Sequence, residues 1–515
     1  MSEGRGRRFA SGALVAAPAA LLTTAAVMRA ARGPSWLAYN FDPTYAYLLN
    51  SLIIVKGYRP FLVHHPGMPL QALGSVVMAG VHAASGSGSL AVDVIARPEQ
   101  FILWIHWVAL LAAAALIAAS GIIVQRRAGL AAALLVQSGP WLSITAASLL
   151  GQLRAEVLIA GTATLWTAFV VAHSIRPEAA TSARLGAATG VTLALHMSAL
   201  PLLVGPLLLT ERWAERRRFA IWTGAAFLVA FAPAWLKLPS FAKVMLNIAL
   251  HSGSYGEGGA TIVDAASYLS AVPRLIASEP AASAIVAIGT AIWIAWTLGD
   301  RASDAAAQRG LGALVATEIA GLLLTAKHPD PHYLVPIYCS LGGTLCLSWR
   351  WLRARWPAHA VGVAALSLSA IVLVQTLAFQ REIQRLKSAR AVQETAAQMA
   401  GTLIAGDHCL AISAYRASSE AEALQWGNIT AQFNGRPILG REIAQRFPRA
   451  LFDMGRLEIR DADWQPVDFD DLLRREPCVI YSGETARAPG GGAAVRVERL
   501  GTSGFESIYR LRPPE

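Results

Sequence analysis

The stretch of sequence that decides the fold is residues 39–71, YNFDPTYAYLLNSLIIVKGYRPFLVHHPGMPLQ, which follows directly after a first apolar segment. It carries a carboxylate, a lysine, an arginine and two adjacent histidines: Asp42, Lys56, Arg59, His64 and His65. Charged side chains beside a bilayer must be hydrated, paired or used, because burying an uncompensated charge is costly. We therefore expect this loop to form most of an active site on the far face of a membrane.

The composition is that of a polytopic membrane protein. Of the 515 residues, 54% are hydrophobic and only 15% are charged, which places the chain in the membrane class before any motif is considered. The formal net charge of +11 does not indicate a nucleic-acid partner, because the arginines fall in short clusters between apolar runs. Such clusters are typical of cytoplasmic loops under the positive-inside rule. The richness in Ala, Arg and Gly is compatible with a bacterial source.

The apolar runs predict about eleven membrane segments. Nine runs approach the ~20 residues that cross ~30 Å of hydrocarbon: 13–28, 101–124, 130–149, 155–174, 219–236, 281–298, 310–326, 332–349 and 359–379. The first is expected to be an uncleaved anchor whose N-terminus stays in the cytoplasm. The count then places the C-terminus outside.

The remaining two segments come from one broken run. Residues 185–209 have arginines on both sides, so a single span would leave one basic cluster outside. The centre of the run is polar at His196 and Ser198, and Pro201 interrupts a helix. We expect two short helices, 185–197 and 200–210, that form a hairpin from the cytoplasmic face.

Two long outer loops follow from this topology. The first, residues 32–100, is expected to hold an interfacial helix at 44–55, in which Tyr45, Leu48, Leu49, Leu52 and Val55 share one face by helical spacing. A second helix, 69–84, is expected to enter the bilayer. The other outer loop contains the glycine-rich residues 251–259, either a mobile substrate flap or a simple connector.

The composition becomes polar after Arg381. We expect a membrane module at 1–380, which includes the outer loop, and an extracytoplasmic α/β domain at 381–515. Strand-like runs at 409–412 and 478–481 follow a helical stretch at 389–404. Two cysteines of this tail, Cys409 and Cys478, either form a disulfide or stay free. The other two, Cys339 and Cys346, lie in an apolar run and are expected to be packing residues.

The first loop offers a base and a set of phosphate contacts. Asp42 has two interpretations: an N-cap, since Asp-Pro-Thr is an ordinary helix start, or a general base on an acceptor hydroxyl. Lys56, Arg59, His64 and His65 are candidates to hold a phosphate, the arginine by paired donors and the lysine as a point charge.

Further polar clusters lie in other outer turns. One contains Lys327, His328, Asp330, His332 and Tyr333. Its His-x-Asp-x-His pattern lacks a third well-spaced group, so contacts to phosphate or sugar are favoured over a metal, and no metal or other cofactor is expected.

Arg154 and Glu156 form another cluster, with a structural and a functional interpretation of equal weight. His196, in the broken run, is expected to be a packed polar residue.

With these residues in order, the chain resembles the GT-C membrane glycosyltransferases, in the branch of the protein O-mannosyltransferases and lipid A aminoarabinose transferases. The resemblance covers residues 10–380. It rests on an early Asp in a long outer loop, a His-Pro-x-x-Pro-Leu stretch at 65–70, the break near His196, and His-Tyr-Leu-x-Pro at 332–336.

The resemblance implies an inverting transfer of a hexose or pentose from a polyprenyl-phosphate donor, with Asp42 as the catalytic carboxylate. The acceptor would be a lipid, a polysaccharide or a protein. The enzyme would lie in a bacterial inner membrane with its C-terminal domain in the periplasm. A phosphate leaving group needs cations to stabilise it and no second carboxylate to protonate it.

The chain also departs from that pattern. Many relatives carry Asp-Glu where this chain has Asp42-Pro43, and Glu156 is the nearest replacement for the missing carboxylate. The lipid A branch carries Glu-Lys-Pro-Pro where this chain has residues 64–67, HHPG, so phosphate contact would pass to histidines whose charge varies near pH 7.

Two other classes of function remain. A transporter or flippase of a lipid-linked saccharide would use an acid inside a span, of which Glu318 is the main candidate. A non-catalytic scaffold would tolerate substitution throughout the first loop.

Overall fold

The computed structural model describes residues 2–63, 67–86, 88–252, 259–299, 304–406, 408–433, 436–453, 458–485 and 495–513, with side chains from residue 12. The chain divides into two compact units. The bundle unit comprises Met1–Met28, Val63–Leu70 and Val108–Glu382, and the loop–tail unit comprises Arg29–Leu62, Gln71–Trp107 and Ile383–Glu515. The expected two-part division also ended near residue 380, but it kept the first outer loop with the membrane module, whereas the structure groups most of that loop with the tail.

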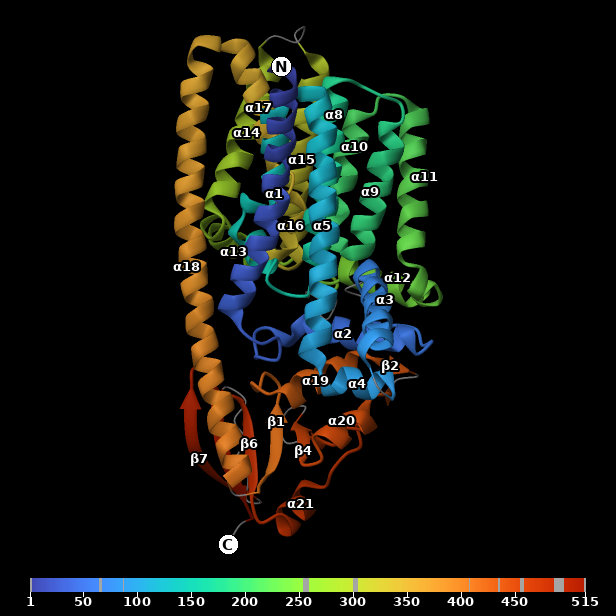
Figure 1. Ribbon diagram of the computed structural model, residues 1–515, viewed down its shortest axis with the longest axis vertical. Coiled ribbons are helices and arrows are strands. Elements are labelled where there is room, and N and C mark those ends of the chain that lie inside the picture. The colour runs from blue at the N-terminus through green and yellow to red at the C-terminus, as the bar shows by residue number, and fades with distance from the viewer. Residues whose placement is uncertain are drawn as a thin grey trace. The chain divides into compact units, whose positions relative to one another are not determined.

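The structure is mostly helical (Figure 1). The α-helices before residue 300 are α1 (Ser2–Arg32), α2 (Phe41–Val55), α3 (Met68–Ser85), α4 (Leu90–Ala96), α5 (Pro98–Ala128), α6 (Leu130–Gln137), α7 (Ile144–Leu149), α8 (Ala155–Ile175), α9 (Thr181–Leu195), α10 (Val204–Leu209), α11 (Trp213–Ala230), α12 (Leu238–Leu250), α13 (Ala265–Ser278) and α14 (Pro280–Leu298). Those after it are α15 (Ala305–Leu324), α16 (Val335–Tyr338), α17 (Leu341–Arg355), α18 (Pro357–Gly406), α19 (Glu420–Thr430), α20 (Gly440–Arg446) and α21 (Phe469–Arg475).

Short 3₁₀ helices and strands complete the description. The 3₁₀ helices are η1 (Gly139–Trp141), η2 (Met197–Leu203), η3 (Ala232–Lys237), η4 (Thr325–Lys327) and η5 (Pro331–Leu334). The strands are β1 (Leu410–Ala414), β2 (Gln432–Phe433), β3 (Arg436–Pro437), β4 (Ala450–Asp453), β5 (Ile459–Arg460), β6 (Val479–Glu484), β7 (Arg496–Ser503) and β8 (Glu506–Arg512).

Six helices of the described chain are long and apolar enough to cross a membrane, or up to eight if each of two bent pairs is one span. The protein is therefore a multi-pass membrane protein, and the difference from eleven lies in interrupted segments. The predicted span 130–149 is broken into α6, η1 and α7, because Gly139-Pro140 cannot continue a helix and Ser143 caps the next one, accepting from the Ala146 N–H at 3.1 Å. The predicted span 332–349 is likewise divided among η5, α16 and α17.

The break and return of the chain predicted at 185–210 are present, but the second half is the 3₁₀ helix η2 followed by the short α10 rather than one helix. Helix α9 ends at Leu195, and His196 is extended (φ −161°, ψ 138°) and accepts from the Ser198 N–H at 3.1 Å, which starts η2. The chain then returns through α10. Arg218, at the start of α11, donates to the Ala179 carbonyl at 2.7 Å just before α9, so the hairpin enters and leaves at the same face.

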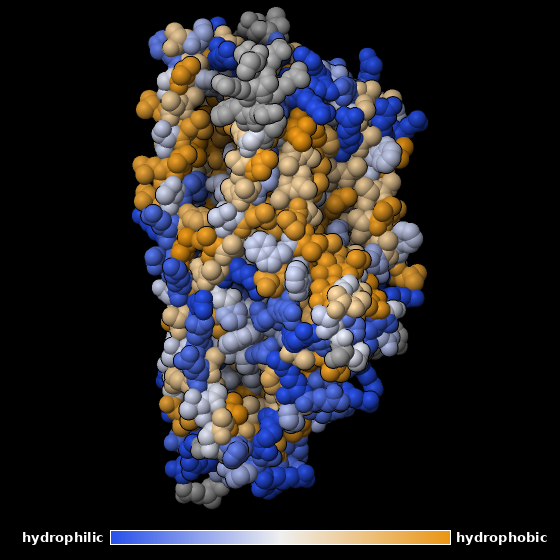
Figure 2. All heavy atoms as spheres, viewed as in Figure 1, coloured by the Kyte–Doolittle hydropathy of each residue, from blue (hydrophilic) through white to orange (hydrophobic). Residues whose placement is uncertain are grey.

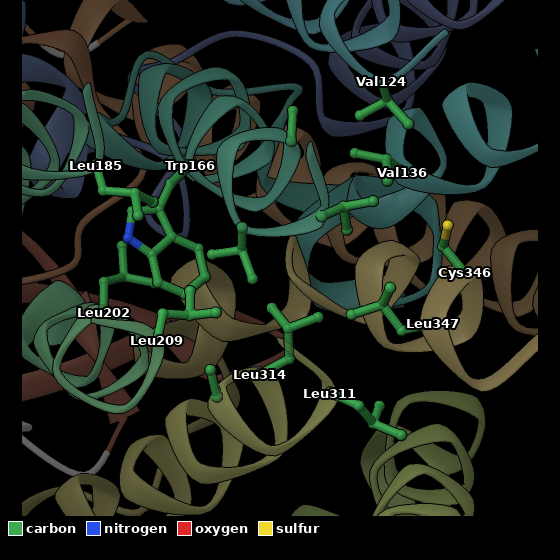
Figure 3. Close-up of a cluster of buried hydrophobic side chains, with 14 of the residues drawn as sticks. Val124, Val136, Trp166, Leu185, Leu202, Leu209, Leu311, Leu314, Cys346 and Leu347 are labelled. Atoms are coloured by element: carbon green, nitrogen blue, oxygen red, sulfur yellow. The ribbon is translucent and has the colours of Figure 1, made fainter. Parts of the chain in front are cut away.

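The core of the bundle unit lies where α8, α9, α10, α15 and α17 meet (Figure 3). Trp166 of α8 is its largest fully buried side chain, and Leu202, Leu209 and Leu314 lie around it. Cys346 is buried in the same cluster, as expected of a packing residue. Hydrophobic side chains cover most of the bundle helices on the face shown in Figure 2, where lipid takes the place of water.

The sheet of the loop–tail unit has six strands in the order β5-β4-β1-β6-β8-β7. Strand β1 is parallel to both β4 and β6, and β1 and β6 are the strands predicted at 409–412 and 478–481. Alternate residues of β1 and β6 face opposite sides, so Ile412 and Tyr481 enter one core while Ile480 packs with the end of α18 in the other. The Cys409–Cys478 disulfide is formed and joins the residues that precede β1 and β6.

A membrane span and a tail helix that were predicted separately form one continuous helix. Helix α18 runs without a break for 50 residues through both the predicted span 359–379 and the predicted helical stretch 389–404. Its last turns contact the sheet, since Met399 and Leu403 pack against the buried Ile480 and Ile508.

The pH dependence of the tail's stability is predicted to depend on Glu506. Burial raises the pKa of Glu506 to about 7, although both carboxylate oxygens accept from the Ser418 N–H, at 3.1 and 3.2 Å. The folded state therefore holds a proton that the unfolded state releases near pH 4.5, so stability is full below that pH and falls as pH rises toward 7. Glu506→Gln should flatten the pH profile of thermal unfolding between pH 4.5 and 7, with the largest gain in melting temperature above pH 7. Equal losses for both proteins across this range would contradict the assignment.

Helix α2 is buried on more than its predicted apolar face. Tyr45, Leu48, Leu49 and Leu52 are buried as their shared face predicts, but so are residues of the opposite face such as Tyr47 and Ser51. Both faces are buried because α19 of the tail packs against α2 within the loop–tail unit, so the helix is not exposed along one side as an amphipathic surface helix would be.

Candidate active site

A polar cluster of the bundle unit forms where four helices begin or end. Arg154 precedes α8, His196 follows α9, His328 follows η4, and His332 and Tyr333 lie in η5. The rings pack at tilted angles: the Tyr333 ring centroid lies 3.9 Å from that of His332, 4.9 Å from that of His328 and 5.6 Å from that of His196. The structure thus joins two clusters that lie about 170 residues apart in the sequence, and it adds His196, which was expected to be a packed residue.

Glu156 is the acid of this cluster. Its side chain is 7% exposed, and Oε1 lies 3.3 Å from the Arg154 guanidinium. Glu156 also interacts electrostatically with His196 and His332. A buried carboxylate needs such partners, so the predicted Arg154–Glu156 pair is formed and belongs to the polar cluster.

Asp330 orients His332. Its Oδ1 accepts from the His332 backbone N–H at 3.1 Å and lies 2.5 Å from the ring Nδ1. Burial acts to raise the pKa of Asp330, but the hydrogen bond and charge of His332 outweigh it and hold that pKa at about 2. With Nδ1–H donated to Asp330, the ring turns Nε2 toward its other surroundings. No group of three or more His, Cys, Asp or Glu side chains in the described ranges is placed to hold a metal ion.

Lys327 stands at the end of η4 beside the glycine-rich outer loop. Its Nζ donates to the His251 carbonyl at 2.7 Å, within the bundle unit. Residues 253–258, the candidate flap, lie outside the described residues.

The loop–tail unit holds the other predicted residues. Asp42 is exposed and extended (φ −96°, ψ 124°) at the start of α2, a geometry compatible with both the cap and the base. Lys56 forms an ion pair with Glu442 at 3.6 Å, so a carboxylate of the same unit partly neutralises its charge. Arg59 is exposed on the turn after α2. His64 and His65 lie outside the described residues.

One half-buried group of this unit was not predicted from the sequence. Glu99, at the start of α5, accepts from the Tyr45 hydroxyl at 3.1 Å and from Arg29 at 3.4 Å. Tyr45 was expected only as an apolar contact. A buried tyrosine hydroxyl needs a hydrogen-bond partner, but this partner, Glu99, lies 54 positions further along the chain.

The arrangement of the chain defines its fold, which is that of the GT-C membrane glycosyltransferases, as its motifs predicted. In particular, it is similar to ArnT from Cupriavidus metallidurans bound to undecaprenyl phosphate, with a TM-score of 0.52 and 13% identity over 97% of this chain and 98% of that one. The apo state of the same protein gives a TM-score of 0.48 over 96% and 97%. A peptide-tethered Archaeoglobus fulgidus oligosaccharyltransferase gives 0.38 at 13% identity over 80% and 62%. No protein-family model and no curated protein sequence matches the chain.

Proposed function

We propose that the protein is an inverting glycosyltransferase that moves a sugar from a polyprenyl-phosphate donor to a lipid, polysaccharide or protein acceptor at the outer face of a bacterial inner membrane. The observation that carries the proposal is the polar cluster, in which Arg154 and three histidines surround Tyr333 and the buried Glu156 where four element ends of a GT-C fold meet. The ArnT structure, which has this fold, contains undecaprenyl phosphate, and this supports the same class of donor.

In this reaction each of the site residues has a distinct role. Asp42 takes the proton of the acceptor hydroxyl, whose oxygen attacks the anomeric carbon. The bond from that carbon to the phosphate oxygen breaks, and the electron pair leaves with the polyprenyl phosphate. Arg154, Lys327 and His332 stabilise the phosphate charge, and Glu156 and Asp330 orient the first and last of these. The single displacement inverts the anomeric centre.

The test is sugar transfer by the purified full-length protein in lipid, offered a panel of radiolabelled polyprenyl-phosphate sugars with membrane extracts as acceptors. We expect one donor to give a labelled product whose anomeric configuration is opposite to that of the donor. Retained configuration would contradict the single displacement. A folded protein that transfers no sugar from any donor would favour the transporter, in which case Glu318→Gln should block function.

A further inference from the structure

We infer that the C-terminal domain positions the segment that carries Asp42, with Trp426 and Thr430 of α19 as positioning residues. The inference deepens the proposed function and rests on it for the role of Asp42. The contacts that carry it lie wholly within the loop–tail unit. They run between α2 in the first outer loop and α19 in the tail.

The first contact holds the residue before Asp42. Phe41 is 1% exposed, and its ring centroid lies 6.3 Å from those of both Tyr415 and Trp426. The latter two rings are 5.2 Å apart. These spacings are those of tilted aromatic pairs. Because Phe41 is bonded to Asp42, a socket that fixes its ring also fixes the backbone from which the carboxylate projects.

The second contact is the buried side chain of Asn50. Its Oδ1 accepts from the backbone N–H groups of Phe61 and Leu62, at 3.1 and 3.2 Å. Its Nδ2 donates to Thr430 Oγ1 at 3.1 Å and to the Ala46 carbonyl at 2.9 Å. Asn50 is fully buried, so these partners are required. One side chain therefore links α2, the turn that follows it and the end of α19.

The third contact is the close approach of the two helices. A Cβ on Gly427 of α19 would lie 2.6 Å from the Tyr45 carbonyl oxygen, a distance that forces the backbones apart. Lys56, at the end of α2, pairs with Glu442 of the next tail helix. The start of α19 is itself fixed, because Ser419 caps it by accepting from the Glu422 N–H at 3.1 Å.

These contacts give the C-terminal domain a role in the transfer step itself. A general base works only when its oxygen lies within hydrogen-bonding reach of the acceptor proton, and a misplacement of about 1 Å can cost on the order of a hundredfold in rate. Loosening α19 should therefore slow the chemistry and leave donor binding by the bundle unit intact.

The experiment compares Trp426→Ala with Trp426→Phe in the full-length protein in lipid. Trp426→Ala empties one wall of the Phe41 socket. We expect kcat to fall about tenfold or more with the donor KM changed less than about twofold, and amide hydrogen exchange in residues 41–62 to accelerate. Trp426→Phe should restore both, because the buried indole N–H has no acceptor among the described residues and the ring contact is kept.

A second pair separates positioning from general stability. Thr430→Val keeps the shape of the side chain and removes the oxygen that accepts from Asn50. Tyr481→Phe removes one buried hydrogen bond of the same unit, from the Tyr481 hydroxyl to Asp453 at 2.8 Å in the sheet. We expect Thr430→Val to lower kcat and speed exchange in 41–62, and Tyr481→Phe to do neither.

Each outcome decides the inference. Unchanged exchange in 41–62 and unchanged kcat in Trp426→Ala would overturn it, as would an equal fall of kcat in Tyr481→Phe. If Trp426→Ala does not fold, the kcat and the hydrogen exchange of Thr430→Val decide the inference in its place. If the wild-type protein transfers no sugar, the proposed function fails, and exchange in 41–62 alone still decides whether α19 holds the segment.

Discussion

Asp42→Asn is expected to lower the transfer rate by about 10² to 10⁴-fold, the usual contribution of a general base. Asn has nearly the same size and cannot take the acceptor proton at neutral pH. It is also as good an N-cap as Asp, so the substitution keeps the alternative function of Asp42 at the start of α2. Loss of transfer with an unchanged melting temperature would therefore identify the base. The measurement is the initial rate of transfer from the active donor by the protein in lipid.

The matched control is Asp470→Asn, in the first turn of α21 in the same unit. It removes the same charge from another exposed helix start, and the transfer rate should stay within about twofold of wild type, as for most surface substitutions. Full activity in Asp42→Asn would show that Asp42 serves α2 only as a cap. The base would then have to be sought elsewhere, with Glu156 as the first alternative.

The parts of the fold that local chemistry dictates are those the sequence could predict. The hairpin break follows from His196, Ser198 and Pro201, all of which disfavour a continuous apolar helix. The β1 and β6 strands follow from short apolar runs bounded by polar residues. Each of these signals lies within about ten residues of the structure it specifies, so no distant contact was needed.

The parts that the sequence could not predict depend on distant partners. Helical spacing identified one apolar face of α2, but Asn50 lies on another face and is buried because Thr430, 380 residues later, accepts its hydrogen bond. The run 130–149 is apolar enough for a span, and only Gly139-Pro140 indicated its break. A Cβ on Gly139 would lie 2.3 Å from the Cys339 carbonyl oxygen, so a close backbone approach also requires that glycine.

The candidate site shows the same division. The sequence supplied the members of the polar cluster, since Arg154, Glu156, His332 and Tyr333 stand at turns between apolar runs. It left the Arg154–Glu156 pair balanced between a structural and a functional role. Their placement in one cluster with His196 depends on three separate helix ends meeting, and no spacing along the chain encodes that meeting.

Arg154→Ala, alone and combined with Glu156→Gln, is expected to separate those two roles. The single substitution leaves the buried Glu156 without its guanidinium partner. Breaking a buried pair in this way costs about 3–5 kcal/mol, and less here because the Arg154 side chain is 18% exposed. The double variant removes the buried charge together with its partner, so we expect its melting temperature to return toward that of wild type.

The transfer rate should not return with the stability. If Arg154 stabilises the charge on the departing phosphate, the double variant still lacks that cation, and its kcat should remain about a hundredfold below wild type. Glu156→Gln alone keeps the guanidinium and loses only the carboxylate that orients it, so we expect a kcat between those of wild type and the double variant. A double variant that regains both stability and rate would assign the pair a purely structural role and leave the phosphate charge to Lys327 and His332.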